Sequence, residues 1–97
     1  MYALAAKLTF HISFAESLKD KRQVRRSLTD KTRGHFNVSV AEVGAQDVHR
    51  TLILGISIVS GESAAARDYL DEIIRYMERT AGDLGAELMD CEIYNII

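Results

Sequence analysis

Hydrophobic and polar side chains alternate along much of this chain, beginning with residues 2–13. The two sides of this alternation are Leu4, Ala6, Leu8, Phe10 and Ile12 against Ala3, Ala5, Lys7, Thr9 and His11. A period of two predicts a strand with one side buried. Residues 36–43 and 51–60 alternate in the same way, and 51–60 is apolar on nearly every position, as expected of a central strand.

A fourth strand is predicted over residues 86–96, in which Met89, Cys91 and Ile93 share a face. Between the second and third strands, Gly44 to Asp47 has the composition of a turn. These two strands are therefore expected to form a hairpin.

Two segments show helical spacing instead. Ser17 is placed to cap the first helix by accepting a hydrogen bond from the amide of Asp20, and we expect this helix to run to Arg33 and to end at a left-handed Gly34. The second is expected to open at Ser60-Gly61 and to close at Gly82 or Gly85. Its apolar positions recur every three or four residues: Ala66, Tyr69, Leu70, Ile73 and Met77.

The predicted order is βαββαβ, and each helix has one apolar stripe that must cover an apolar sheet face. The sequence therefore predicts an α+β two-layer sandwich of the ferredoxin-like type, with a four-stranded antiparallel sheet and both helices on one face. A chain of 97 residues, 47% hydrophobic and 27% charged, suits a single domain over residues 1–97. The second and fourth strands are expected at the sheet edges.

Charge is distributed unevenly along the chain. Residues 17–35 carry seven Lys and Arg against two Asp, whereas residues 62–97 carry three Arg against nine Asp and Glu. At 100° per residue, one arc of about 60° on the first helix holds Lys19, Arg22, Arg26 and Arg33, with Arg25 beside it. Lys21 and Lys31 fall near the buried side, where their stems would lie over apolar surface, so neither is expected to contact a ligand. This stripe is suited to binding the phosphates of a nucleic acid. The alternative is that it is simply the solvated polar face that every amphipathic helix has.

The other face of the predicted sheet offers small side chains, among them Ala3, Ala5, Gly55 and Ser57. They would let a second copy of the chain or another protein approach closely, and the two edge strands are open to pairing with a partner. No row of aromatic residues for stacking bases is visible there. Protein interaction or homodimerisation through this face or an edge strand is therefore the alternative to RNA binding.

Three segments, residues 17–22 (SLKDKR), 36–43 (FNVSVAEV) and 54–60 (LGISIVS), resemble in order and spacing the YlxP-like family of small bacterial proteins of unknown function. The resemblance implies a ferredoxin-like fold. Because genes of this family usually lie beside genes for translation and ribosome-maturation factors, it also implies association with the ribosome, with structured RNA or with a translation-related protein. It implies no established reaction.

No catalytic constellation is found. His11, His35 and His49 fall on different predicted elements without metal-ligand spacing, and neither a phosphate loop nor a nucleophile elbow occurs. We therefore expect a protein that is not an enzyme and uses no metal or cofactor.

The chain has one cysteine, Cys91, and no apolar run of about 20 residues. We therefore expect a cytoplasmic protein without a membrane partner.

The loops before the two helices are expected at the same end of the sheet, where Glu16 and Glu62 would oppose an anion.

Overall fold

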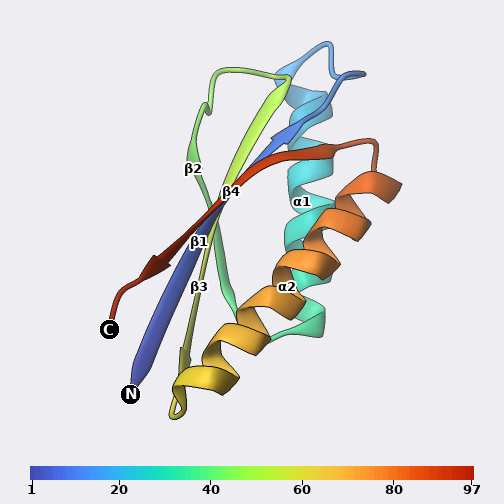
Figure 1. Ribbon diagram of the computed structural model, residues 1–97. Helices are drawn as coiled ribbons and strands as arrows, with labels where there is room; N and C mark the ends of the chain where they lie inside the picture. Colours follow the sequence, from blue (N-terminus) through green and yellow to red (C-terminus); the bar gives the residue numbers. More distant parts are fainter.

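The computed structural model describes residues 1–97 and has the predicted order of elements (Figure 1). The bounds are β1 (Tyr2–His11), α1 (Leu18–His35), β2 (Ser39–Gly44), β3 (Thr51–Ser60), α2 (Ser63–Asp83) and β4 (Glu87–Asn95). The strands form one sheet in the order β2-β3-β1-β4, and every neighbouring pair is antiparallel. The predicted fold and the edge positions of the second and fourth strands are confirmed.

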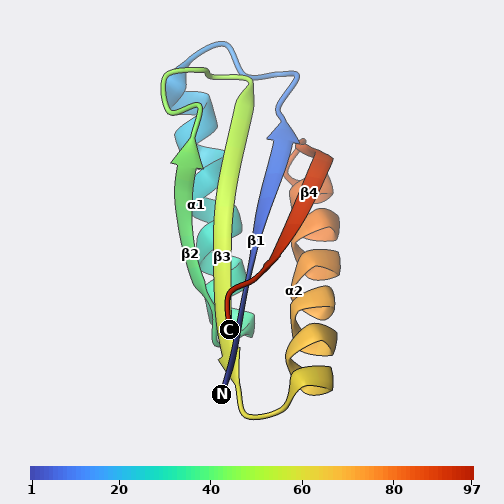
Figure 2. The same cartoon turned by 60° about the vertical axis from the view of Figure 1, so that its left-hand side comes forward.

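Both helices lie on the same side of the sheet (Figures 1 and 2). The alternation in β1 and β3 determines which side they cover, because the helix-facing positions are the buried ones. β1 and β3 contribute Leu4, Ala6, Leu8, Phe10, Leu52, Leu54, Ile56 and Ile58 to the core, and α1 and α2 contribute Val24, Leu28, Ala66, Leu70, Ile73, Met77 and Ala81. Neither helix is long and apolar enough to span a membrane.

The start of α1 confirms the predicted cap. The Ser17 hydroxyl accepts a hydrogen bond from the Asp20 amide at 3.2 Å, and the Asp20 carboxylate accepts one from the Glu16 amide at 3.0 Å. One amide of the first helical turn and one of the preceding loop are satisfied in this way.

The end of α1 differs from the prediction, because Gly34 is helical and the helix runs to His35. Phe36, in extended conformation, follows it and donates its amide to the Thr32 carbonyl. The Phe36 ring meets Tyr69 and Tyr76 of α2 edge-on. We attribute the extra helical length to this packing, which holds the last turn against α2. As a result, β2 begins at Ser39 rather than at Phe36.

Both ends of α2 also differ slightly from the predicted ones. The helix begins at Ser63 after Glu62, since Ser60 makes a local turn by accepting the Glu62 amide at 3.2 Å. Gly82 remains helical, and Gly85, with φ of +84°, is the left-handed residue after the helix. Of the two predicted stops, the second is the one used.

The predicted face of β4 is wrong for Met89. The pairing with β1 shifts between Thr9 and Phe10, so that Phe10 pairs with Leu88 while Thr9 pairs with Asp90. Met89 is the extra residue of this bulge and is exposed, whereas Leu88, Cys91 and Ile93 pack against the core. One inserted residue moves all preceding side chains to the opposite face.

The two loops that precede the helices do not share a sheet end. β1 and β3 are antiparallel neighbours, with Tyr2 opposite Ser60 and His11 opposite Thr51. The strand ends that lead into α1 and α2 therefore lie at opposite ends of the molecule (Figure 1). The prediction that Glu16 and Glu62 lie at the same end of the sheet is therefore wrong.

A second bulge shapes the outer face of the sheet, the face that carries no helix. Between Glu42 and Gly44 the pairing of β2 with β3 shifts by one residue, which leaves Val43 as the extra residue. The Val43 side chain lies over Gly55, where an added Cβ would be 2.8 Å from Val43 Cγ1. Position 55 suits glycine because the Val43 side chain already occupies the space that a Cβ would need.

Replacing Gly55 with Ala is expected to lower the free energy of unfolding by about 1 kcal/mol, because the new methyl group clashes with Val43. In a Val43→Ala background, the same Gly55→Ala change is expected to be neutral or stabilising, since alanine restricts the unfolded chain more than glycine does. Urea unfolding of the four proteins of this double-mutant cycle measures the coupling. Equal effects of Gly55→Ala in both backgrounds would contradict the contact.

Candidate functional site

The basic stripe predicted on α1 is partly free and partly engaged. Lys19, Arg22 and Arg26 are exposed, and none of them takes part in the ion pairs of the structure. No carboxylate neutralises these three cations at close range. They form the accessible part of the stripe.

The other two stripe residues are held by β2. Arg33 donates from Nη2 to the Val40 carbonyl at 2.6 Å. Arg25 donates from Nη1 to Glu42 Oε1 at 3.1 Å and is about one third exposed. Both side chains keep their charge and most of their guanidinium donors, but their positions are fixed by the edge strand.

Lys21 is buried, with a side chain 3% exposed. Its ammonium lies 2.8 Å from Glu42 Oε2 and donates to the carbonyls of Ala45 at 2.6 Å and Val48 at 3.0 Å. The ammonium thus donates two hydrogen bonds to backbone carbonyls and forms a close ion pair with the carboxylate. The prediction that Lys21 is not a ligand contact agrees with this position, whereas Lys31 is exposed and bonds only Ser27 of its own helix.

Glu42 is the centre of this arrangement and was not singled out from the sequence. Burial by itself raises the pKa of its carboxyl, but hydrogen bonds from Lys21 and Arg25 and the attraction of their charges outweigh burial and lower it. The alternation of the sequence could have pointed to Glu42, because it lies two residues after the buried Val40 and therefore on the same, inward side of the strand. A carboxylate at an inward position of a strand calls for a cationic partner.

A groove of about 310 Å³ lies between α1 and the edge strand β2. Its lining from α1 is Arg25, Arg26, Thr29, Asp30 and Arg33, and its lining from β2 is Val40, Ala41 and Glu42. Three of the five predicted stripe residues thus meet in one depression. Lys19 lies outside it, and Arg22 lines a neighbouring depression of about 60 Å³.

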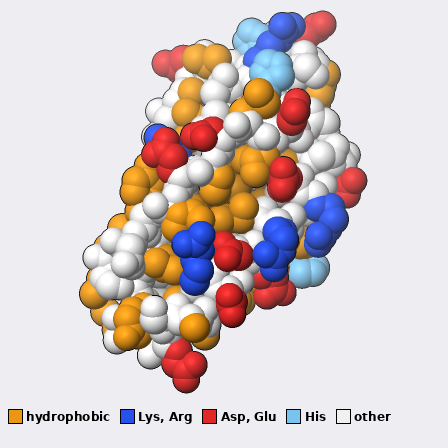
Figure 3. Space-filling view, viewed as in Figure 1, with side chains coloured by type: hydrophobic (Ala, Val, Ile, Leu, Met, Phe, Trp, Pro, Cys, Tyr) orange, Lys and Arg blue, Asp and Glu red, His pale blue; other side chains and the backbone are white.

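The outer sheet face holds the second set of predicted residues. Ala3, Ala5 and Gly55 are half-buried there and Ser57 is exposed. Larger apolar side chains border them: Val43 is 53% exposed and Val59 is 70% exposed. In Figure 3 the lower left of the molecule, on the sheet side, shows mainly hydrophobic and uncharged side chains.

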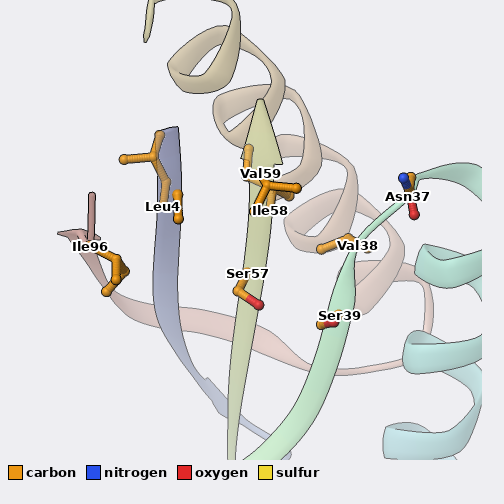
Figure 4. Close-up of a pocket in the computed structure, with 9 residues that line it drawn as sticks. Leu4, Asn37, Val38, Ser39, Ser57, Ile58, Val59 and Ile96 are labelled. Carbon is orange, nitrogen blue, oxygen red and sulfur yellow. The ribbon is translucent and has the colours of Figure 1, made fainter. Parts of the chain in front are cut away.

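The outer face continues into a groove of about 410 Å³. β2 begins opposite Ser57, so beyond Ser57 β3 has a neighbouring strand only on the β1 side, and the chain leading into β2 lies apart from β3 there (Figure 4). Leu4, Val38, Val59 and Ile96 supply much of the lining. The apolar surface therefore extends from the sheet centre to the chain termini.

Reactive groups are few. No cluster of His, Cys, Asp or Glu is placed to hold a metal ion. Burial raises the pKa of the Cys91 thiol, and the nearby Asp90 carboxylate raises it further, which disfavours the nucleophilic thiolate. Glu92 pairs with Lys7 at 3.6 Å and accepts the Tyr94 hydroxyl, so it is engaged on the sheet surface.

Fold and site together define a small α+β domain of the ferredoxin-like type with a basic first helix. Residues 4–93 match the model of a family described as "Protein of unknown function (DUF503)", and the chain belongs to this family. It is 31% identical over 64 residues to the uncharacterized protein YlxP of Bacillus subtilis (strain 168), covering 66% of this chain and 70% of that protein. The resemblance to the YlxP-like family is thereby confirmed.

Solved structures share the fold at low sequence identity. A de novo designed protein with a ferredoxin fold is 12% identical, with a TM-score of 0.55 over 98% of this chain and 83% of its own. A C-terminal segment of the alpha subunit of aIF2 from Pyrococcus abyssi is 11% identical, with a TM-score of 0.51 over 98% of this chain. This chain spans 51% of the aIF2 segment. These likenesses show the fold alone.

Replacing Glu42 with Gln is expected to lower the free energy of unfolding at pH 7 by about 3 kcal/mol, because the buried Lys21 loses its counter-charge. The folded-state pKa of Glu42 is below its ordinary value, so its contribution is complete above about pH 5 and is lost as the pH falls through the folded pKa. Urea unfolding from pH 7 to pH 3 is therefore expected to show a difference between wild type and variant that shrinks on acidification.

Glu92→Gln is the matched control, since its ion pair with Lys7 is exposed. It is expected to change stability far less than Glu42→Gln at pH 7. An equal effect of the two substitutions would contradict the central position of Glu42.

Proposed function

We propose that this domain is a non-catalytic binding module that associates with structured RNA, such as ribosomal RNA, through α1. The observation that carries the proposal is the exposed row of Lys19, Arg22 and Arg26, which has no acidic partner within the protein. Unpaired cations on one helix face bind phosphates by charge and release counterions. The usual gene neighbourhood of the family supports the same partner.

The positions of the aromatic residues favour recognition of the RNA backbone over recognition of bases. His35 stacks on Tyr76 at 4.5 Å, and Phe36 meets Tyr69 and Tyr76 edge-on at 5.8 and 5.3 Å. These rings join the end of α1 to α2. They are engaged with one another, and the outer sheet face offers only Tyr94 near its centre.

The double substitution Arg22→Glu/Arg26→Glu is expected to abolish binding to structured RNA, because two attractive contacts become repulsive. For the wild type, the logarithm of affinity should fall with the logarithm of salt concentration with a slope of about −3 if four phosphates are engaged. Fluorescence anisotropy with a labelled ribosomal RNA fragment measures both.

Arg75→Glu/Arg79→Glu is the control for net charge, since it changes the charge by the same amount and both arginines are exposed on α2 without an ion pair. It is expected to bind RNA nearly as the wild type does. RNA affinity that is unaffected by the α1 substitutions would refute the proposed site.

A second candidate function is homodimerisation through the outer sheet face. Its apolar surface, continuous with the groove beside the end of β3, is the observation that favours it. Strands spaced about 4.8 Å apart and rising about 3.3 Å per residue give a face of about 600 Å². Two copies would bury about 1,200 Å², at the lower end of specific interfaces.

Val59→Arg is expected to convert a dimer into a monomer, because it places a charge in the apolar contact. Val59 is 70% exposed, so the fold should tolerate the change. Light scattering at high protein concentration gives the mass, with Glu72→Arg on α2 as the control. A wild type that stays monomeric would exclude this candidate. Gly55 is unsuitable for such a test because Val43 lies against it.

A further inference from the structure

We infer that the groove between α1 and β2 is a seat for a single phosphate group of the bound RNA, built from arginines that the edge strand holds in place. The inference rests on the proposed function and deepens it. It adds two positioning groups, the Glu42 carboxylate and the Val40 carbonyl, to a set of cations predicted from the helix alone.

Arg33 is held at the wall of the groove. Its Nη2 donates to the Val40 carbonyl at 2.6 Å, which uses one of five guanidinium donors. The remaining donors stay available while the side chain is fixed. A guanidinium that is already ordered loses less conformational freedom when it binds a phosphate than a free surface side chain does.

Arg25 is fixed through a chain of contacts. Its Nη1 bonds Glu42 Oε1 at 3.1 Å, and the other oxygen, Oε2, lies 2.8 Å from the buried ammonium of Lys21. Glu42 thus lies between two cations, and Lys21 balances its charge. Arg25 remains a net positive donor at the groove.

The backbone of β2 adds a neutral donor. In an antiparallel strand the N–H and C=O of one residue point to the same side. Because the Val40 carbonyl is reached by Arg33 from α1, away from β3, the Val40 N–H also points toward the open edge and the groove. Two arginine forks and one amide surround a common space, a combination suited to the several oxygens of a phosphate.

The same contact argues against an extended acidic peptide as the occupant. A peptide adding as a strand needs the Val40 carbonyl as an acceptor, and Arg33 already donates to it. Asp30 also lines the groove and opposes any anion. Its charge is outnumbered there by Arg25, Arg26 and Arg33.

The test is NMR titration of the ¹⁵N-labelled full chain with inorganic phosphate at constant ionic strength. Saturable shifts are expected for the Nε–Hε signals of Arg25 and Arg33 and for the Val40 amide, with Arg75 on α2 unchanged. Uniform shifts of all arginines, or none, would overturn the inference. Asp30→Asn should strengthen phosphate binding by removing an opposing charge.

Arg33→Lys keeps the charge and loses the fork, so it should weaken phosphate binding about tenfold, the ratio expected for one lost hydrogen bond to a charged group. Glu42→Gln, confirmed as folded from its amide spectrum, removes a negative charge but holds Arg25 less firmly, so it should broaden the Arg25 signal. An Arg25 signal that stays sharp in Glu42→Gln, together with phosphate binding that is unchanged in Arg33→Lys, would refute the positioning roles.

RNA anisotropy separates this inference from the proposed function. If Arg22→Glu/Arg26→Glu abolishes RNA binding while Arg33→Lys leaves it unchanged, the α1 interface stands and the phosphate seat fails. Localised phosphate shifts without any RNA binding would support the seat as an anion site and refute the proposed function.

Discussion

The buried ammonium of Lys21 is the interaction on which the arrangement of this domain depends. It joins the first turns of α1 to Glu42 of β2 and to the carbonyls of Ala45 and Val48 in the hairpin loop. Ala45 has φ of +51°, a conformation that costs energy for a residue with a Cβ. The bond from Lys21 to its carbonyl helps to offset that cost. An unpaired charge at this depth would be costly. The ion pair therefore favours the one position of α1 against β2 in which both charges are paired.

This anchor also orders the basic surface formed by α1 and β2. By holding Glu42, Lys21 also holds Arg25, and the alignment of α1 beside β2 brings Arg33 to the strand edge. The arginines thereby cover part of an edge that is otherwise open to pairing with other chains. The outer sheet face is organised separately, by a bulge that places Val43 over Gly55. The basic and apolar surfaces therefore lie on different sides of the domain.

The segment SLKDKR, which carries part of the family resemblance, divides its residues between fold and surface. Ser17 and Asp20 cap α1, and Lys21 anchors it. Lys19 and Arg22 are exposed. The motif is thus explained in large part by the need to start α1 at a fixed place over the hairpin, and only its exposed cations are left for a ligand.

The sequence by itself determined the order of elements, the sheet face that the helices cover, the helix cap and the arc of cations on α1. These properties follow from local periodicity and from side chains a few residues apart. The tertiary structure decided the two bulges, the exposure of Met89, the extension of α1 through Gly34 and the partners of Lys21, Arg25 and Arg33. These depend on contacts between residues distant in sequence, where packing and charge pairing outweigh local preference. Only the fold brings a carboxylate of β2 to two cations of α1, or a valine of one strand over a glycine of the next.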